Sequence, residues 1–246
     1  MRYFAELAYF GKAYHGWQNQ PAAITVQQCV EKSLFTLFQE KIEITAAGRT
    51  DAGVHARQMF AHFDTEQEFD AGSLVYKLNS ILPKDIAVER VFPVKQDAHA
   101  RFDALSRSYE YHIIQKKDPF LYENAFYVKK VLDVAAMNEA AGALKNYRNF
   151  KCFSKSRTDV KTYNCTVTEA LWKKEDDRLI FYITADRFLR NMVRAVVGTL
   201  LEIGEKKQPV EYIREVIESE NRSKAGSSVP AHGLYLTNIQ YPNLQE

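Results

Sequence analysis

A loop in the first half of the chain carries residue types that suit covalent or acid–base chemistry. Gly48 and Gly53 flank Arg49 and Asp51 in this loop. Glycine permits tight turns and the close approach of a ligand. A carboxylate at such a tip can serve as a nucleophile, a general base or a metal ligand. The residue types leave a structural alternative open, in which Asp51 closes an Asx turn by bonding to its own backbone.

A row of arginines in the second half has helical spacing. Arg187, Arg190 and Arg194 stand at i, i+3 and i+7, which places them on one face of a helix predicted over residues 188–203. A solvated face is the usual explanation of such a row. The remainder of the segment is strongly apolar, however, so we expect these cations to meet an anion or a buried carboxylate.

The basic segment, residues 145–161, holds six basic side chains against one acidic side chain. Aromatic residues are interleaved with the cations, a pattern typical of a loop that contacts RNA phosphates. The alternative is an ordinary solvated loop. Residues 202–220 carry six acidic and three basic side chains, and we expect them to face away from a nucleic acid. The candidate RNA-binding residues are Lys151, Lys155 and Arg157.

Histidines near the glycine-flanked loop raise the question of a metal. His55 and His62 could join Asp51 and Asp64 as ligands. A strand from about residue 57 would set its side chains on alternating faces, and no second His/Cys cluster supports such a site. We therefore expect no metal.

Composition bounds the class of protein. The chain has 246 residues with 33 basic and 31 acidic side chains, and 46% of its residues are apolar. These values exclude a polycationic tail and a disordered chain, and they allow one large domain or two ordinary ones. Three cysteines without a CxxC pair suit reduced thiols. The longest apolar run, residues 195–201, is far below the roughly 20 residues that span a bilayer. We expect a soluble, cytoplasmic protein with no membrane partner.

The elements that must position these residues follow from hydrophobic periodicity. In the first half we predict strands at 2–10, 42–47, 59–65 and 86–93, and helices at 25–39, capped by Thr25, and at 70–82, opened by Asp70 or Ser73. In the second half we predict strands at 106–115, 166–173, 178–185 and 234–241, and helices at 133–147, capped by Asp133, at 188–203 and at 210–219.

Each half has the order β-α-β-β-α-β, which predicts an α+β fold of two ferredoxin-like halves. We expect antiparallel sheets joined edge to edge, with helices on one face. The predicted division is residues 1–104, with the Asp51 loop, and residues 105–246, with the basic segment.

The segment GRTDAGVHA, residues 48–56, closely resembles the signature of the tRNA pseudouridine synthase A family. Further segments resemble that family in the family's order, and together they cover essentially the whole chain. They are GWQ (16–18), LNSILP (78–83), HARF (99–102), RSYEY (107–111), FLRNMVR (188–194) and GLYL (233–236). One departure is Phe10, where the family usually has Asp, and it affects the shape and contacts of the first loop.

The resemblance implies an enzyme that isomerises uridine to pseudouridine at positions 38, 39 and 40 of tRNA, in the anticodon stem-loop, without a cofactor. It implies that Asp51 is the catalytic aspartate and that Tyr109 packs against the target base. It also implies that Arg49 helps to flip the base, that Arg194 lies near the catalytic carboxylate, and that the protein is a homodimer with tRNA across both subunits.

These residue types suit that reaction, which breaks the N1–C1′ bond, rotates the uracil and joins C5 to C1′. The carboxylate of Asp51 could add to C6, attack C1′ or deprotonate the sugar, and each route needs it ionised. A guanidinium lowers the pKa of a carboxyl group, so we expect Arg194 to pair with Asp51. Without the resemblance, Tyr109 would be read as a core aromatic of a strand.

Two other functions stay open. The first is a catalytically silent RNA-binding module built from two ferredoxin-like units. Asp51 argues against it, because binding alone does not need a carboxylate beside phosphates. The second is a metal-dependent phosphoesterase that uses Asp51, His55 and Asp64.

Overall fold

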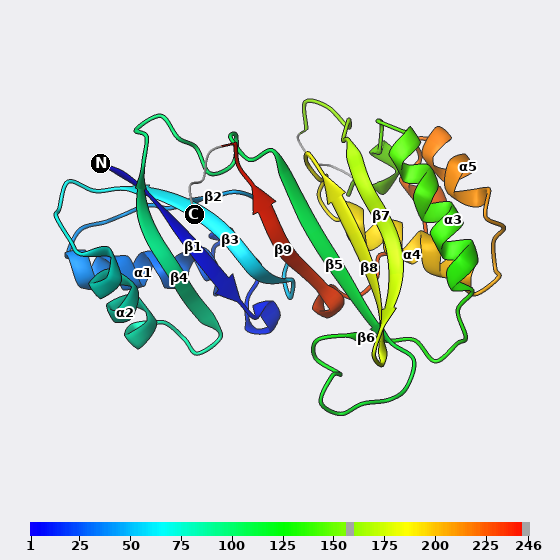
Figure 1. Ribbon diagram of the computed structural model, residues 1–246, viewed down its shortest axis with the longest axis horizontal. Coiled ribbons are helices and arrows are strands. Elements are labelled where there is room, and N and C mark those ends of the chain that lie inside the picture. The colour runs from blue at the N-terminus through cyan, green and yellow to red at the C-terminus, as the bar shows by residue number, and fades with distance from the viewer. Residues whose placement is uncertain (156–159, 243–246) are drawn as a thin grey trace. The chain divides into compact units, whose positions relative to one another are not determined.

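The computed structural model describes residues 1–155 and 160–242 (Figure 1). The chain forms two compact units. The first consists of Met1–Leu105 together with the C-terminal stretch from Tyr235, and the second of Ser106–Leu234. No helix in the described part of the chain is both long and apolar enough to cross a bilayer.

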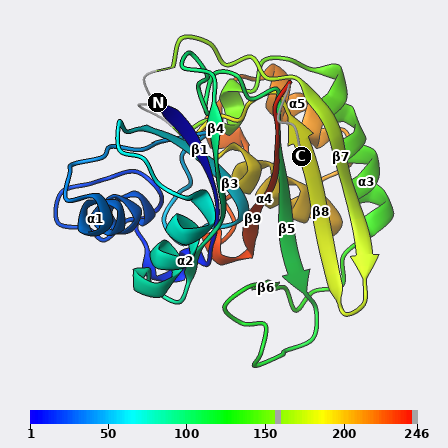
Figure 2. The same ribbon diagram turned by 60° about the vertical axis from the view of Figure 1, so that its left-hand side comes forward.

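The first unit is a mostly antiparallel sheet with two helices. Its strands run in the order β4-β1-β3-β9, and the short β2 pairs with β3. Figure 1 and Figure 2 show α1 and α2 on the same side of this sheet. The elements are β1 (Arg2–Tyr9), α1 (Val26–Phe38), β2 (Thr45–Ala46), β3 (His55–Asp64), α2 (Ala71–Ile81), β4 (Ile86–Val94) and β9 (Leu234–Gln240).

Local capping sets where the helices of the first unit begin. The Thr25 side chain accepts a hydrogen bond from the Gln28 N–H and caps α1, and the Asp70 carboxylate accepts one from the Ser73 N–H and caps α2. Both caps confirm the predicted helix starts. The apolar faces of helices and strands meet in a core, in which Leu7, Leu34 and Met59 are at most 1% exposed.

The second unit has the same α+β character. Strands β5, β8 and β7 form an antiparallel sheet in that order, and β6 adds to β5 in parallel. Helix α3 packs on β7 and on α4. The elements are β5 (Ser106–Ile114), β6 (Phe126–Tyr127), α3 (Val134–Ala143), β7 (Val167–Glu175), β8 (Arg178–Ala185), α4 (Met192–Gly204) and α5 (Tyr212–Glu218).

The fold class and most elements agree with the prediction, with one informative difference. Helix α4 begins at Met192 instead of 188, because Asn191 adopts a left-handed conformation with φ of 67° and interrupts the helix there. The last strand, β9, lies where it was predicted, and its residues Tyr235 and Leu236 pair with His55 and Ala56 of β3. A strand's partner is a tertiary choice that periodicity does not encode.

Candidate active site

The Asp51 loop, residues 48–54, joins β2 to β3, and the preceding chain holds its backbone in place. The Trp17 N–H donates to the Thr50 carbonyl at 3.3 Å, and the Gly53 N–H donates to the Tyr14 carbonyl at 3.2 Å. Within the loop, the Val54 N–H donates to the Asp51 carbonyl at 3.2 Å. The turn that presents Asp51 is therefore tied to the segment that follows β1.

Gly16 allows this close approach. Its φ is +87°, in the region that favours glycine, and a Cβ at this position would lie 2.4 Å from the Thr50 carbonyl oxygen. Gly53 also has a positive φ, of 79°, at the far end of the loop. The two glycines serve one purpose, which is to let two loop backbones touch next to Asp51.

Side chains beneath the loop complete the support. The Tyr9 hydroxyl and the Thr50 Oγ1 are 2.9 Å apart and share a buried hydrogen bond. His55 is 1% exposed, and its Nδ1 accepts the Gly11 N–H at 2.9 Å. The His55 ring lies against Phe10, with ring centroids 4.1 Å apart, and against Tyr235, at 4.6 Å.

The departure at Phe10 thus has a definite structural result. An aspartate could not stack on the imidazole of His55, whereas the Phe10 ring lies nearly parallel to it, at 20°. Hydrophobic contact and stacking therefore take the place of a charge at this position. The loop that follows β1 is therefore held by the packing of Phe10 on His55.

Asp51 is half-buried and Arg49 is exposed, and both stand on the same loop two residues apart. The structure thus brings these two predicted site residues together in the first unit. It places the other two, Tyr109 and Arg194, in the second unit. The expected pairing of Arg194 with Asp51 stays a prediction.

Tyr109 lies on β5 opposite Ile183 of β8. Its ring meets Phe188 edge to face, with centroids 5.1 Å apart and planes at 86°. Tyr109 is half-buried, whereas Tyr111, two residues along on the same face, is fully buried and donates its hydroxyl proton to the Pro230 carbonyl at 2.8 Å. Tyr111 is the core aromatic of this strand, and Tyr109 occupies the more open end of the same face.

Arg194 lies in the first turn of α4 and is half-buried. Its Nε donates to the Val229 carbonyl at 2.7 Å, and the Val229 N–H donates to the Arg194 carbonyl at 3.2 Å. These bonds fix its stem against the chain before β9. The expected arginine row on one helical face is wrong, because Arg187 and Arg190 both precede α4, which begins only after Asn191.

The basic segment is only partly available to an anion. The Lys151 Nζ lies 3.4 Å from a carboxylate oxygen of Glu220, so the acidic stretch approaches the basic one instead of facing away from it. Lys155 is exposed, and its backbone N–H donates to the carbonyl of Arg190, which is also exposed, at 3.0 Å, so the two basic residues are neighbours. Arg157 lies outside the described residues.

The histidine contacts disfavour the metal alternative. The Nδ1 atoms of His55 and His62 accept backbone N–H groups, from Gly11 and Ala100 respectively. Burial lowers the pKa of His62 to about 4. Asp64 forms an ion pair with Arg2 at 2.8 Å. Within the ranges 1–155 and 160–242, no three His, Cys, Asp or Glu side chains are grouped to hold an ion.

Sequence reasoning missed the supports of the site. Tyr9, Gly16 and Phe188 received no role, although Gly16 and Phe188 lie in segments that carry the family resemblance. What pointed to them in the sequence was the occurrence of those segments in the family's order along the chain. Their contacts with residues of the Asp51 loop or with Tyr109 are tertiary and have no sequence spacing of their own.

Two α+β units, a carboxylate on a fixed glycine-flanked loop and exposed cations near aromatic rings are features of an enzyme that acts on nucleic acid. The comparisons with known proteins specify which. The family model described as tRNA pseudouridine synthase matches residues 5–103 and 140–242. The chain belongs to this family and is an isomerase that converts uridine to pseudouridine in tRNA.

Similar proteins cover nearly the full chain. A tRNA pseudouridine synthase A of Parabacteroides distasonis is 52% identical over 244 residues, which covers 98% of this chain and 96% of the relative. One of Porphyromonas gingivalis is 50% identical over 246 residues, covering 98% of each. The tRNA pseudouridine synthase A 2 of Clostridium perfringens is 40% identical over 237 residues, covering 96% of this chain and 97% of the relative.

Proposed function

We propose that this isomerase acts on uridines 38, 39 and 40 of the tRNA anticodon stem-loop and that Asp51 is its nucleophile or general base. The observation that carries the proposal is the placement of Asp51. It is half-buried on a loop whose backbone bonds to residues 14 and 17, with exposed Arg49 beside it. A fixed carboxylate next to a cation suits covalent chemistry at a sugar that is flanked by phosphates.

The reaction needs a carboxylate and no cofactor. The N1–C1′ bond breaks, the uracil rotates, a new bond joins C5 to C1′, and the proton leaves C5. Asp51 could add to C6, attack C1′ or deprotonate the sugar, and every route begins from its ionised form. A guanidinium beside it favours that form, and this is the role we assign to Arg194.

The target base must leave the stack before it can react, at a cost of a few kcal/mol. Arg49 is exposed on the Asp51 loop, so it can fill the gap that the base leaves or hold a phosphate. Tyr109 is proposed to stack on the extruded uracil, and such stacking contributes about 1–3 kcal/mol. The edge-to-face contact with Phe188 restricts the motion of the Tyr109 ring, which supports this role.

The second unit is proposed to contact tRNA phosphates away from the target uridine. Lys151, Lys155 and Arg157 are the candidate phosphate ligands, and Lys155 has the exposed Arg190 next to it. We also propose, from the family resemblance, that the protein acts as a homodimer in the cytoplasm with tRNA as its partner. Residues 1–104 and 105–246 are proposed as its two halves.

The test uses anticodon stem-loop RNA that carries a single uridine tritiated at C5. Isomerisation releases this tritium to water, so we expect release from RNA with the labelled uridine at 38, 39 or 40. The matched control is the same stem with the label one pair further from the loop. Absence of release at all three positions contradicts the proposal and favours a silent binding module. Release that stops when EDTA is added favours metal chemistry instead.

A further inference from the structure

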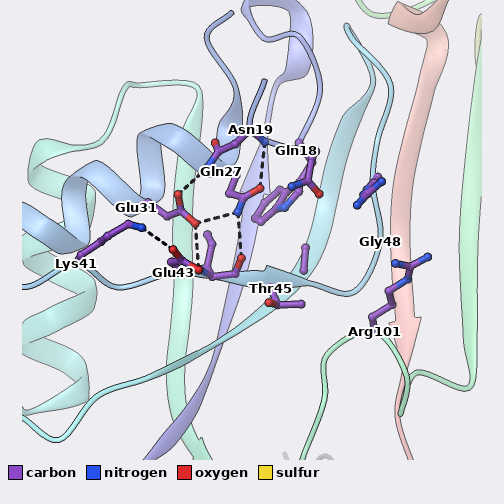
Figure 3. Close-up of a pocket in the computed structure, with 13 residues that line it drawn as sticks. Gln18, Asn19, Gln27, Glu31, Lys41, Glu43, Thr45, Gly48 and Arg101 are labelled. Atoms are coloured by element: carbon purple, nitrogen blue, oxygen red, sulfur yellow. Dashed lines mark hydrogen bonds and ion pairs between the residues drawn. The ribbon is translucent and has the colours of Figure 1, made fainter. Parts of the chain in front are cut away.

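A polar pocket opens next to the Asp51 loop, and of the residues that line it only Arg49 has a role in the proposed function. Its volume is about 470 Å³, within the roughly 300–1,000 Å³ typical of small-molecule sites. Gly48 and Arg49 form part of its wall, and all of its lining residues belong to the first unit. Figure 3 shows Gly48 and Arg101 on one side of the pocket and Glu31, Gln27 and Glu43 on the other.

The far wall is a closed hydrogen-bond network. The Glu31 carboxylate accepts from the Gln27 Nε2 at 2.9 Å, from the Asn19 Nδ2 at 2.7 Å and from the Ile44 N–H at 3.1 Å (Figure 3). The Gln27 Nε2 also donates to the Ile44 carbonyl, and its Oε1 accepts from the Asn19 N–H. Because these groups bond to one another, they form the wall and are not the groups that we expect to bind a ligand.

Other lining groups are available for a ligand. Among the described residues, none bonds to the Gln18 amide, the Thr45 hydroxyl or the Arg49 guanidinium. Arg101 contributes a second guanidinium to the lining, on the side of Gly48 (Figure 3). The buried indole of Trp17 contributes apolar surface. A few placed polar groups around an apolar surface are what a planar, polar-edged ligand such as a nucleobase needs.

The charges orient such a ligand. Lys41 and Glu43 pair at 2.6 Å and neutralise each other. The carboxylate of Glu31 remains on the far wall, whereas Arg101 lies on the side of Gly48 (Figure 3), and Arg49, the next residue along the loop, also lines the pocket. A phosphate therefore belongs beside Arg49 and Arg101, whose planar forks match its oxygens, and the base belongs toward Gln18 and Thr45.

We infer that this pocket binds the nucleotide that adjoins the target uridine in the same RNA strand, with its base inside and its phosphate on Arg49 and Arg101. Two residues of extended chain span about 7 Å at most, so Arg49 lies within one nucleotide of a sugar held at Asp51. This inference deepens the proposed function and rests on it, since it takes the substrate to be RNA with a uridine at Asp51.

The experiment compares an intact anticodon stem-loop with two copies that lack one base, at the nucleotide 5′ or 3′ of the labelled uridine. We expect one of the two abasic RNAs to lower kcat/KM of the wild-type enzyme about tenfold, because the pocket contacts to that base are lost. Thr45→Trp fills the pocket from an exposed strand position, where an aromatic residue is tolerated. We expect kcat/KM of this variant to be about tenfold lower than that of the wild type on intact RNA. We expect it to be the same on intact and abasic RNA.

The controls keep the inference separable from folding and from the proposed reaction. Thr168→Trp makes the same change at an exposed threonine of β7 in the second unit and should keep the wild-type response. Gln18→Ala, a smaller change, should also reduce the response to the missing base if Thr45→Trp does not fold. The affinity of the Asp51→Asn protein for the three RNAs repeats the comparison without turnover. It therefore tests whether the pocket binds the adjoining base even if no tritium is released.

Two results overturn the inference. One is a wild-type enzyme, or an Asp51→Asn protein, that treats both abasic RNAs like the intact one. The other is a Thr45→Trp or Gln18→Ala protein that keeps the full tenfold response. If the wild-type enzyme releases no tritium from intact RNA, the proposed function is contradicted instead. The affinities of the Asp51→Asn protein then test the pocket independently.

Discussion

The Asp51 loop of the first unit and the basic segment of the second both carry proposed site residues, but different contacts hold them. The loop is fixed through its backbone, by bonds from Trp17 to Thr50 and from Gly53 to Tyr14, and through the buried bond between Tyr9 and Thr50. In the basic segment, the amino group of Lys151 meets Glu220 at 3.4 Å on the surface.

This difference follows from the two tasks. A group that attacks one atom loses rate steeply when it is misplaced, because a shift of about 1 Å can cost roughly a hundredfold. Cations that attract a polyanion act through a field that extends about 10 Å at 0.1 M salt, so their exact position matters less. The Asp51 loop therefore has backbone bonds and positive-φ glycines around its carboxylate. The backbone of the basic segment is also bonded, for example from the Phe150 N–H to the Tyr163 carbonyl at 3.0 Å, but its cations stand on long, exposed side chains.

The largest effect that the comparison predicts is at Asp51. Asp51→Asn removes the ionisable oxygen and keeps the shape, so we expect kcat for tritium release to fall at least about 1000-fold while Kd for tRNA changes less than about threefold. Single-turnover release and a filter-binding titration measure the two quantities. An activity that stays within tenfold of wild type contradicts a direct chemical role for Asp51.

The next effect tests whether the backbone ties position that carboxylate. Gly16→Ala adds a methyl group 2.4 Å from the Thr50 carbonyl at a φ of +87°, so the two loop backbones must move apart. We expect kcat to fall about 10- to 100-fold with KM nearly unchanged, and the free energy of unfolding to fall by about 1–3 kcal/mol. Steady-state kinetics and urea unfolding give both values.

Gly142→Ala is the matched control for this change. Gly142 lies in α3 with open space around its Cβ position, so alanine there should leave kcat unchanged and stabilise the protein by about 0.5–1 kcal/mol. If Gly16→Ala lowers stability but leaves kcat intact, the contact between the loops supports the fold and has no positioning role.

The same contrast explains how much of the fold could be predicted from the sequence. Caps are local, so Thr25, Asp70 and Asp133 indicated the helix starts that the structure has. The start of α4 was wrong because Asn191 takes a left-handed conformation inside an apolar run. The pairing of β9 with β3 joins residues about 180 positions apart in sequence, which no local pattern encodes.

For the site, the sequence indicated the residues that a motif carries and missed those that hold them. Asp51 and Arg49 are candidates because of their glycine-flanked loop, and their roles stay predictions. The bond from Tyr9 to Thr50 spans 41 positions and is visible only in the folded chain. The Phe10 ring on His55 was likewise unforeseen, because the resemblance marked Phe10 as a departure without showing what it would contact.

A smaller effect is expected in the basic segment. Lys155→Glu should weaken tRNA binding about tenfold and reduce the slope of log K against log salt by about 1, because one phosphate contact is lost. Lys151→Glu should do less, since Glu220 already holds part of that charge. Lys174→Glu makes the same change at an exposed position of β7 and serves as control. An unchanged slope for Lys155→Glu would mean that the basic segment is an ordinary solvated loop that does not contact phosphates.

The smallest effect separates one side-chain bond from the backbone frame around it. Tyr9→Phe deletes the hydroxyl that meets Thr50 Oγ1 at 2.9 Å and keeps the ring. A typical hydrogen bond contributes about 1 kcal/mol net, so we expect kcat to fall only two- to fivefold with KM unchanged. Tyr3→Phe, on the same strand, removes a hydroxyl whose contact is the Met1 Sδ at 3.8 Å and should change neither. A loss as large as that of Gly16→Ala would mean that this side chain, and not the backbone, positions the Asp51 loop.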